Sequence, residues 1–352
     1  MKKILLFACL SVSSMPLYAQ PKALEQAYTH KNLTVYLLQS DNLISREYIT
    51  LEEALKSNKV ILHETGSVNE LQIENKSNDY VFIMSGDIVK GGKQDRTISE
   101  DLVLKPRSKK VSLASFCVEQ SRWQKRGSED VSKFTSSSNM LSNRNLKIAA
   151  RSSKNQSAVW AEVAEFQTNV GTNVSADIRS ERSASSLQLS LENKDFQKSL
   201  AEYKKALSAA FDGKENIVGF VCCINGKVVS AEWFGNVKLA AKLRIKLLES
   251  VASEAIFSYN KDLKYTQCSQ TEITDFLKEA ERGTETVSET GDDMLLRKRE
   301  TEKATVFKSY NVSASEHPLH VSIYSTEDLS LSEGSSVNQQ YQYGGFQNIR
   351  NR

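Results

Sequence analysis

No part of the sequence approaches the roughly 18 consecutive apolar residues that a membrane-spanning helix needs. Histidine is scarce, with four among 352 residues, so few sites can use an imidazole as a base or as a metal ligand. Neither sign of charge dominates, because 46 lysines and arginines face 43 acidic residues, and this balance argues against non-specific nucleic-acid binding. Hydrophobic residues make up 39%, which is slightly low for a compact globule, so we expect part of the chain to lie outside the core.

The first 19 residues have the order of a secretory signal. Lys2 and Lys3 give a positive start, residues 4–12 are apolar, and the segment ends with Ala19, a small residue suited to cleavage. The apolar part is too short to span a bilayer, so we expect cleavage near Ala19 and a soluble chain that is periplasmic or secreted. A lipoprotein signal with a lipidated Cys9 is the alternative, but the apolar region before Cys9 is short for one. Removing the two lysines lowers the net charge from +3 to +1.

Four cysteines follow the expected signal: Cys117, Cys222, Cys223 and Cys268. An oxidising compartment permits disulfides, and four cysteines allow three pairings. A bridge between the adjacent Cys222 and Cys223 would be strained, and a chain of this length does not depend on cross-links. Buried free thiols and one long-range disulfide both stay open.

Hydrophobic patterning predicts one domain over residues 30–324, preceded by a polar lead-in at residues 20–32. Its first part, about 30–123, is β-rich, with apolar stretches typical of strands at residues 33–38, 60–63, 70–74, 80–84 and 111–118. Thr50 and Glu53 form a capping-box pattern, which predicts a short helix over residues 51–57. Residues 124–157 are polar, and we expect them to be a long exposed insertion. Residues 171–187 are similarly polar, and residues 158–166 are expected to form a helix around Trp160.

The part from about 158 to 324 mixes helices and strands. An apolar stripe at helical spacing covers Phe196–Phe211, and residues 239–255 predict a long amphipathic helix. A second capping box at Ser269–Glu272 opens another helix, which ends at Gly283. Residues 319–324 read as the last strand, and residues 325–352 as a disordered tail. These patterns predict an α+β fold, a mainly antiparallel sheet with several amphipathic helices packed on it and long polar insertions.

The strongest local signal is a hairpin over residues 217–234. Asn225-Gly226 is the preferred pair for a two-residue type I′ turn between apolar strands. Simple alternation from this turn places on one face Val218, Phe220, Cys222, Ile224, Val229, Ala231 and Trp233. Both faces are largely apolar, so we expect the hairpin to be central and covered on both sides.

The densest polar feature runs from Ser85 to Arg96 and contains the candidate binding residues Asp87, Gly91, Gly92, Lys93, Gln94, Asp95 and Arg96. Two adjacent glycines let the backbone approach a ligand or turn sharply. Lys93 and Arg96 can hold an anion, while Gln94 and Asp95 can bond hydroxyls or amides. The spacing is not that of a phosphate-binding P-loop, because an extra glycine intervenes and Gln94 replaces the hydroxyl residue. The alternative is a hairpin turn whose charges pair with one another.

A second polar feature follows at Phe116–Trp123 and adds the candidates Cys117, Glu119, Arg122 and Trp123. On a strand, Cys117 and Glu119 share one face while Phe116 and Val118 share the other. Cys117 beside charged groups could be a thiolate nucleophile, although no histidine sits in a recognisable cysteine-hydrolase context. A buried, inert cysteine is the commoner case. Arg122 and Trp123 could stack against a flat ligand or cap the core.

Metal binding has little support in the sequence. His317 and His320 offer two imidazoles, but no carboxylate or cysteine lies at a zinc-like spacing from them. We expect His317 to be exposed and His320 to begin the last strand. We therefore expect no metal and no cofactor.

Taken together, these segments resemble the ADP-ribosylglycohydrolase- and rhodanese-phosphatase-associated protein domain family. The residues that carry the resemblance are Gly86-Asp87, Gly91–Arg96, Phe116–Glu119 with Arg122-Trp123, Gln156–Trp160, Ile224–Val229 and the helix after Phe234. The resemblance covers roughly residues 30–324 and implies a shared α+β domain without implying a settled activity. Asp87 stands where the family more often has Glu.

Three hypotheses follow. The first is an exported, non-catalytic domain whose two polar segments bind a protein partner or an anionic or sugar-like ligand. Lys93 and Arg96 would hold the ligand, Gln94, Asp95 and Glu119 would orient it, and Trp123 would supply a stacking wall. The second is a hydrolase or transferase that uses Glu119 or Asp95 as base, or Cys117 as nucleophile. The third is an assembly protein in which the charges form only an ion-pair network.

Overall fold

The computed structural model describes residues 20–120, 122, 133–141 and 143–327. The expected signal at residues 1–19 and the expected tail from residue 328 onward lie outside these ranges. Within them, the helices are too short or too polar for any one to cross a membrane.

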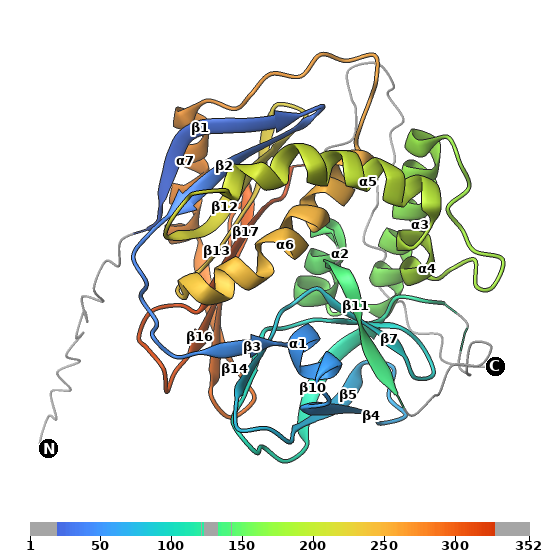
Figure 1. Ribbon diagram of the computed structural model, residues 1–352, viewed down its shortest axis with the longest axis vertical. Coiled ribbons are helices and arrows are strands. Elements are labelled where there is room, and N and C mark those ends of the chain that lie inside the picture. The colour runs from blue at the N-terminus through green and yellow to red at the C-terminus, as the bar shows by residue number, and fades with distance from the viewer. Residues whose placement is uncertain (1–19, 121, 123–132, 142, 328–352) are drawn as a thin grey trace, which may run out of the picture.

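An eight-stranded antiparallel sheet forms the largest layer (Figure 1). Its strands in spatial order are β1 (Lys22–His30), β2 (Leu33–Gln39), β12 (Ile217–Ile224), β13 (Lys227–Phe234), β17 (His320–Ser325), β16 (Ala304–Asn311), β15 (Met294–Glu300) and β14 (Thr284–Thr290). The interpretation of residues 20–32 as a lead-in is wrong, because this segment holds the edge strand β1. Strands β14 to β16 were not expected from the sequence, because β14 is mostly exposed and β15 is largely charged.

The central hairpin β12–β13 has the expected turn but not the expected register. Asn225 and Gly226 both have positive φ, 54° and 78°, as a two-residue I′ turn requires. Cys223 pairs with Val228, yet Cys222 pairs with Ser230, so Val229 bulges out of the ladder. The slip reverses the faces beyond the bulge. As a result Ala231 and Trp233 pack on the face opposite to Phe220, Cys222, Ile224 and Val229. Val218 also packs on that opposite face, where a second register shift lies between Ile217 and Gly219 in the β12–β2 pairing.

Two smaller sheets form the second part of the fold. A six-stranded sheet has the order β11 (Phe134–Leu141), β7 (Asp87–Gly91), β8 (Arg96–Ile98), β10 (Val111–Cys117), β5 (Glu70–Asn75) and β4 (Val60–Glu64). A three-stranded sheet has the order β3 (Tyr48–Thr50), β6 (Tyr80–Ile83) and β9 (Leu102–Leu104). Helix α1 (Leu51–Lys56) follows β3 and begins with the predicted capping box of Thr50 and Glu53. We call these two sheets and α1 the β-lobe.

Helices lie on both faces of the large sheet. On one face lie α5 (Lys194–Leu207), which continues into a 3₁₀ turn (Ser208–Phe211), and the long helix α6 (Val237–Phe257). On the other face lies α7 (Gln270–Lys278), whose predicted capping box is present and which a 3₁₀ turn (Glu279–Glu281) follows. Helices α3 (Gln156–Val174) and α4 (Leu187–Leu191) pack against each other and against α5 (Figure 1). The expected covering of the hairpin on both sides is confirmed, as is the α+β class.

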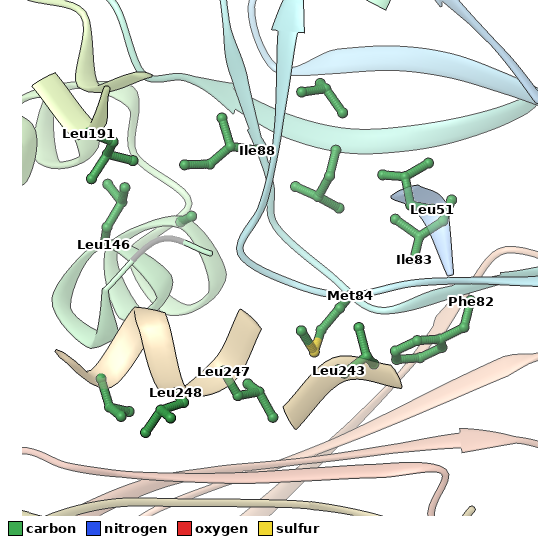
Figure 2. Close-up of a cluster of buried hydrophobic side chains, with 14 of the residues drawn as sticks. Leu51, Phe82, Ile83, Met84, Ile88, Leu146, Leu191, Leu243, Leu247 and Leu248 are labelled. Carbon is green, nitrogen blue, oxygen red and sulfur yellow. The ribbon is translucent and has the colours of Figure 1, made fainter. Parts of the chain in front are cut away.

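Helix α6 joins the large sheet to the β-lobe in one continuous core. Figure 2 shows its leucines in a cluster with side chains of the β-lobe and of neighbouring helices. The members labelled there are Leu51, Phe82, Ile83, Met84, Ile88, Leu146, Leu191, Leu243, Leu247 and Leu248. The helix is buried on nearly every side, including at the polar Lys246, Glu249 and Glu254, so it is less amphipathic than the sequence suggests.

The polar segment 124–157 is folded wherever the structure describes it. It supplies strand β11, helix α2 (Arg144–Ile148) and a π-helical turn (Ala149–Ser153). The side chains of Arg144, Lys147 and Arg151 are buried and form ion pairs with distant carboxylates. Polarity here reflects an internal charge network, not exposure.

Of the alternatives for the cysteines, the structure has one long-range disulfide. It joins Cys223 of β12 to Cys268, two residues before α7, with 6.3 Å between the Cα atoms. Cys117 and Cys222 are buried free thiols.

Candidate functional site

The glycine pair forms the end of the β7–β8 hairpin. Gly91 and Gly92 have φ of 124° and 57°. A Cβ on Gly91 would lie 2.3 Å from the carbonyl oxygen of Lys133, and one on Gly92 would meet the ring of Phe134. Both positions therefore require glycine, because the chain from Lys133 to Phe134 passes directly over them. Of the two roles considered for the glycine pair, close approach to a ligand or a sharp turn, the structure has the sharp turn.

Asp95 and Arg122 connect this turn to the end of β10. The Gly91 amide donates to Asp95 Oδ1 at 3.0 Å, and Arg122 Nη2 lies 3.6 Å from the same oxygen. Arg122 Nε donates to Glu119 Oε2 at 2.6 Å. Ser186, the N-cap of α4, donates to Asp95 Oδ2 at 3.4 Å. The Asp95 carboxylate thus fixes the turn to Arg122 on one side and to α4 on the other.

The Gln94 side chain connects Arg96, Cys117 and Glu119 through hydrogen bonds. Its Nε2 donates to the Glu119 carbonyl at 2.9 Å. Its Oε1 accepts from Arg96 Nη1 at 3.2 Å and from the Cys117 thiol at 2.7 Å. Arg96 Nη2 lies 3.6 Å from Glu64 Oε2. We call Gln94, Asp95, Arg96, Cys117, Glu119 and Arg122 the turn network.

The turn network is interior. Asp95, Arg96, Cys117 and Glu119 are 0% exposed, and Arg122 is 9% exposed. Charges held this deep must be paired, because an isolated buried ion costs several kcal/mol or more. The network is therefore a buried set of ion pairs and hydrogen bonds, whereas the first hypothesis has Arg96, Gln94, Asp95 and Glu119 in direct contact with a ligand.

Cys117 has the environment of an inert thiol. Burial raises its pKa to about 11, against the smaller opposing effect of Arg96. Its backbone amide and carbonyl bond to the side chain of Gln156 on α3, at 2.9 and 2.8 Å. Phe116 and Val118 point instead into the main core, as strand alternation predicts.

The remaining candidates lie apart from the network. Lys93 is half-buried at the turn, and its amide donates to Glu64 Oε1 at 2.9 Å. Asp87 begins β7 and faces α6, where Lys246 Nζ donates to its carboxylate. Trp123 lies outside the described residues. The structure therefore gathers Gln94, Asp95 and Arg96 with the Cys117 segment and separates Asp87 from them.

An exposed loop with small polar side chains contacts the turn network through Cys117 and, by way of Glu64, through Arg96. The loop of residues 65–69 is exposed and connects β4 to β5. Its Val68, 40% exposed, accepts from the Cys117 thiol through its carbonyl at 3.5 Å. Lys93 is tied to the same region through Glu64, the last residue of β4. We call residues 64–69 with Lys93 the turn surface.

A second polar cluster was missed by the sequence analysis. It consists of Asp101, Lys147, Arg151, Glu232 and His320, which lie at the contact between the β-lobe and the large sheet and are all at most 4% exposed. His320 Nδ1 lies 2.9 Å from Asp101 Oδ2 and Nε2 lies 3.3 Å from Glu232 Oε2. No sequence signal marks this cluster, because its members come from four segments spread over more than two hundred residues.

Metal ligation has no geometric basis among the described residues. They contain no group of three or more His, Cys, Asp or Glu side chains that could hold an ion. His320 does lie between two carboxylates, but Asp101 faces its Nδ1 and Glu232 faces its Nε2. The two acids therefore lie at different nitrogens of the ring and do not share one ligand position with it.

Comparison with known proteins identifies the family. No curated protein and no solved structure is similar enough to the chain to count as a match. Residues 23–324, which include every strand of the three sheets except the first residue of β1 and the last residue of β17, match the ARG and Rhodanese-Phosphatase-superfamily-associated Protein domain. The chain therefore belongs to the ARG and Rhodanese-Phosphatase-superfamily-associated Protein domain family.

Proposed function

We propose that the protein is an exported, non-catalytic binding domain and that the turn surface is its binding site. The observation that carries the proposal is the burial of the turn network, which contacts this surface through Cys117 and Arg96. Its acids and bases are engaged with one another, and its thiol is held in the protonated form, so the network suits support better than reaction. The network and Glu64 hold the backbone of the turn at Lys93, so little backbone freedom is lost on binding.

The chemistry of the turn surface favours an anionic or sugar-like ligand, or a protein partner carrying such groups. Lys93 brings a cation, and Thr65, Ser67 and Asn69 bring hydroxyl and amide groups that are exposed. Val68 adds a small apolar contact. Arg96, which the sequence analysis placed beside Lys93 as a second ligand cation, would act here indirectly, through Gln94 and Glu64.

Catalysis by the same residues has less support. A general base or nucleophile must reach its substrate within hydrogen-bonding distance. Asp95, Glu119 and Cys117 are all 0% exposed, so a substrate would reach them only after the network had been opened. Binding at the surface needs no such rearrangement.

Export is part of the proposal and rests on the order of residues 1–19. The disulfide between Cys223 and Cys268 agrees with it, because structural disulfides persist in oxidising compartments outside the cytoplasm. Such a compartment offers little ATP or NAD, which favours sugars, phosphates and proteins as ligands.

A thermal-shift screen tests the binding site. Purified protein is screened against nucleotides, sugars and inorganic phosphate, and each hit is repeated on Lys93→Ala and on Lys198→Ala, an exposed lysine of α5. We expect a hit to raise the melting temperature of the wild type and of Lys198→Ala, with the shift lost or at least halved in Lys93→Ala. A ligand that raises all three melting temperatures equally would show that the turn surface is not the site.

A further inference from the structure

His320 is sealed inside the contact between the large sheet and the β-lobe. The side chain is 1% exposed. The ring of Phe234 stacks on the imidazole with 4.6 Å between centroids, and Phe82 of β6 meets it edge-on at 6.2 Å. Since water cannot reach the ring nitrogens, their partners must be protein groups.

Both ring nitrogens of His320 face carboxylates, from Asp101 at 2.9 Å and Glu232 at 3.3 Å. A neutral imidazole has one N–H and one lone pair, so it would turn a lone pair toward one of the two anions. The imidazolium satisfies both. Burial alone would lower the pKa of His320, but the charge of Asp101 and the hydrogen bonds to both carboxylates outweigh it and raise the pKa above its ordinary value of 6.5.

The two carboxylates are themselves kept ionised. Burial would raise the pKa of Glu232, but Lys147 and His320 outweigh it and lower that pKa to about 2. Burial acts in the same way on Asp101, and the charges of His320 and Arg151 hold its pKa well below the usual range. Neither acid can therefore take the proton in place of the histidine near neutral pH.

Each carboxylate also anchors a different part of the fold. Asp101 Oδ2 accepts from Arg151 of the π-helical turn at 3.0 Å, and Oδ1 accepts from the Ser85 amide at 2.7 Å. Glu232 Oε1 accepts from Lys147 of α2 at 2.8 Å and from the Tyr324 hydroxyl at 3.2 Å. Asp101 belongs to the segment between β8 and β9 in the β-lobe, whereas Glu232 lies on β13 of the large sheet. His320 is thus the group that bridges the two anchors.

We propose that the imidazolium of His320 is a proton-operated latch that holds the β-lobe against the large sheet. Asp101 before β9 and Glu232 on β13 face the ring directly. The groups that contact these two carboxylates are Arg151 of the π-helical turn and Ser309 on β16 at Asp101, and Lys147 on α2 and Tyr324 on β17 at Glu232. Loss of the proton removes the positive charge between the two carboxylates. The charge-assisted bond from His320 to Asp101, which joins the large sheet to the β-lobe, becomes a weaker neutral one. Loss of the proton also leaves a buried carboxylate facing a lone pair, which loosens this contact before the rest of the fold.

The sign of the pH dependence follows from the raised pKa. A histidine whose pKa is higher in the folded than in the unfolded protein contributes stability that is fully present below the unfolded value near 6.5. That stability is lost as pH rises through the folded value. The latch is therefore closed in mildly acidic solution and opens toward alkaline pH, in the opposite direction to switches in which protonation disrupts an interface.

Thermal unfolding across pH tests this on the full chain. From about pH 6 to about pH 9, we expect the wild-type melting temperature to fall by roughly 2–4 °C more than that of His320→Gln, which bonds but does not titrate. His63→Gln removes a half-buried histidine on β4, outside the cluster, and should keep the wild-type pH dependence. The proposal would be overturned if the melting temperature of the wild type changed with pH in the same way as that of His320→Gln.

Two measurements on the wild type keep the test independent of whether the variants fold. Nitrogen-15 spectra of the imidazoles should show both ring nitrogens of His320 protonated at neutral pH, and a neutral ring there would overturn the latch. Amide protection factors, corrected for intrinsic exchange, should fall in β9 and α2 on alkaline titration while those of β2 and β12 hold. An equal fall in all four elements would indicate global destabilisation and would also overturn it.

Discussion

At the residue scale, the side chains that the sequence marks as chemically active are those that the fold buries most completely. Arg96 is among the largest fully buried side chains of the described residues, and Asp95 and Glu119 lie beside it at 0% exposure. Their polarity is needed because they satisfy one another and the backbone of a tight glycine turn. A motif of charged residues next to two glycines can thus mark a turn whose conformation the charges stabilise.

Cys117 gives the sharpest residue-scale prediction. Because burial raises its pKa to about 11 and no part of its side chain is exposed, we expect it to resist alkylation in the folded protein. Iodoacetamide at neutral pH, followed by peptide mass spectrometry, should leave Cys117 unmodified until denaturant is added. The buried Cys222, whose pKa burial raises well above the ordinary value, should behave in the same way and serves as an internal reference.

Rapid modification of Cys117 in native protein, with Cys222 protected, would contradict this. It would return the thiol to the set of candidate nucleophiles and would weaken the case for a non-catalytic site.

At the element scale, sequence signals that depend on neighbouring residues predicted the structure correctly. Features that depend on pairing with a distant strand were not predicted. The capping boxes at Thr50 and Ser269 and the Asn225-Gly226 turn depend on residues within a few positions of each other, and all three are present. The bulge at Val229 is different, because it depends on the ladder that β13 makes with β12 and β17. Simple alternation therefore placed Ala231 and Trp233 on the wrong face.

Helix α2 and the π-helical turn show the same limit for charged residues. Arg144, Lys147 and Arg151 lie in a polar stretch with few apolar anchors, which reads as exposed. Their partners Glu254, Glu232 and Asp101 come from elsewhere in the chain, up to 110 residues away. Pairing over such distances leaves no local pattern, so neither the burial of this segment nor the His320 cluster could be predicted.

The disulfide is an element-scale constraint with a measurable contribution. It closes a loop with a sequence separation of 45 between β12 and the start of α7. Loop-closure entropy gives about 4 kcal/mol for a loop of this length as an upper figure. We expect the double variant Cys223→Ser/Cys268→Ser to lose about 2–4 kcal/mol of unfolding free energy in urea titrations.

The wild type with a reducing agent provides the matched comparison. Reduction should lower wild-type stability toward that of the double variant and leave the double variant unchanged. If the reducing agent left the unfolding free energy of the wild type unchanged, the disulfide would contribute nothing to stability.

At the scale of the whole molecule, one hydrophobic core joins the large sheet to the β-lobe. Helix α6 packs on β12 and β13 and, through the cluster in Figure 2, on β6 and β7 of the β-lobe. The turn network lies in the β-lobe and the His320 cluster lies at its border with the large sheet. Strand β7 links the two regions of the β-lobe to α6, because its first residue Asp87 pairs with Lys246 of α6 and its last residue Gly91 begins the glycine turn.

Export is the prediction that belongs to the whole chain. Full-length protein expressed in a bacterium with two membranes should be recovered from the periplasm or the medium, with an N-terminus near Gln20 by intact mass. A variant that lacks residues 2–19 should stay in the cytoplasm, where reducing conditions keep Cys223 and Cys268 as thiols. Full-length protein that stays cytoplasmic and retains residues 1–19 would contradict export. The two forms would then differ in location, in N-terminus and in the state of one disulfide, so three independent measurements bear on a single signal of 19 residues.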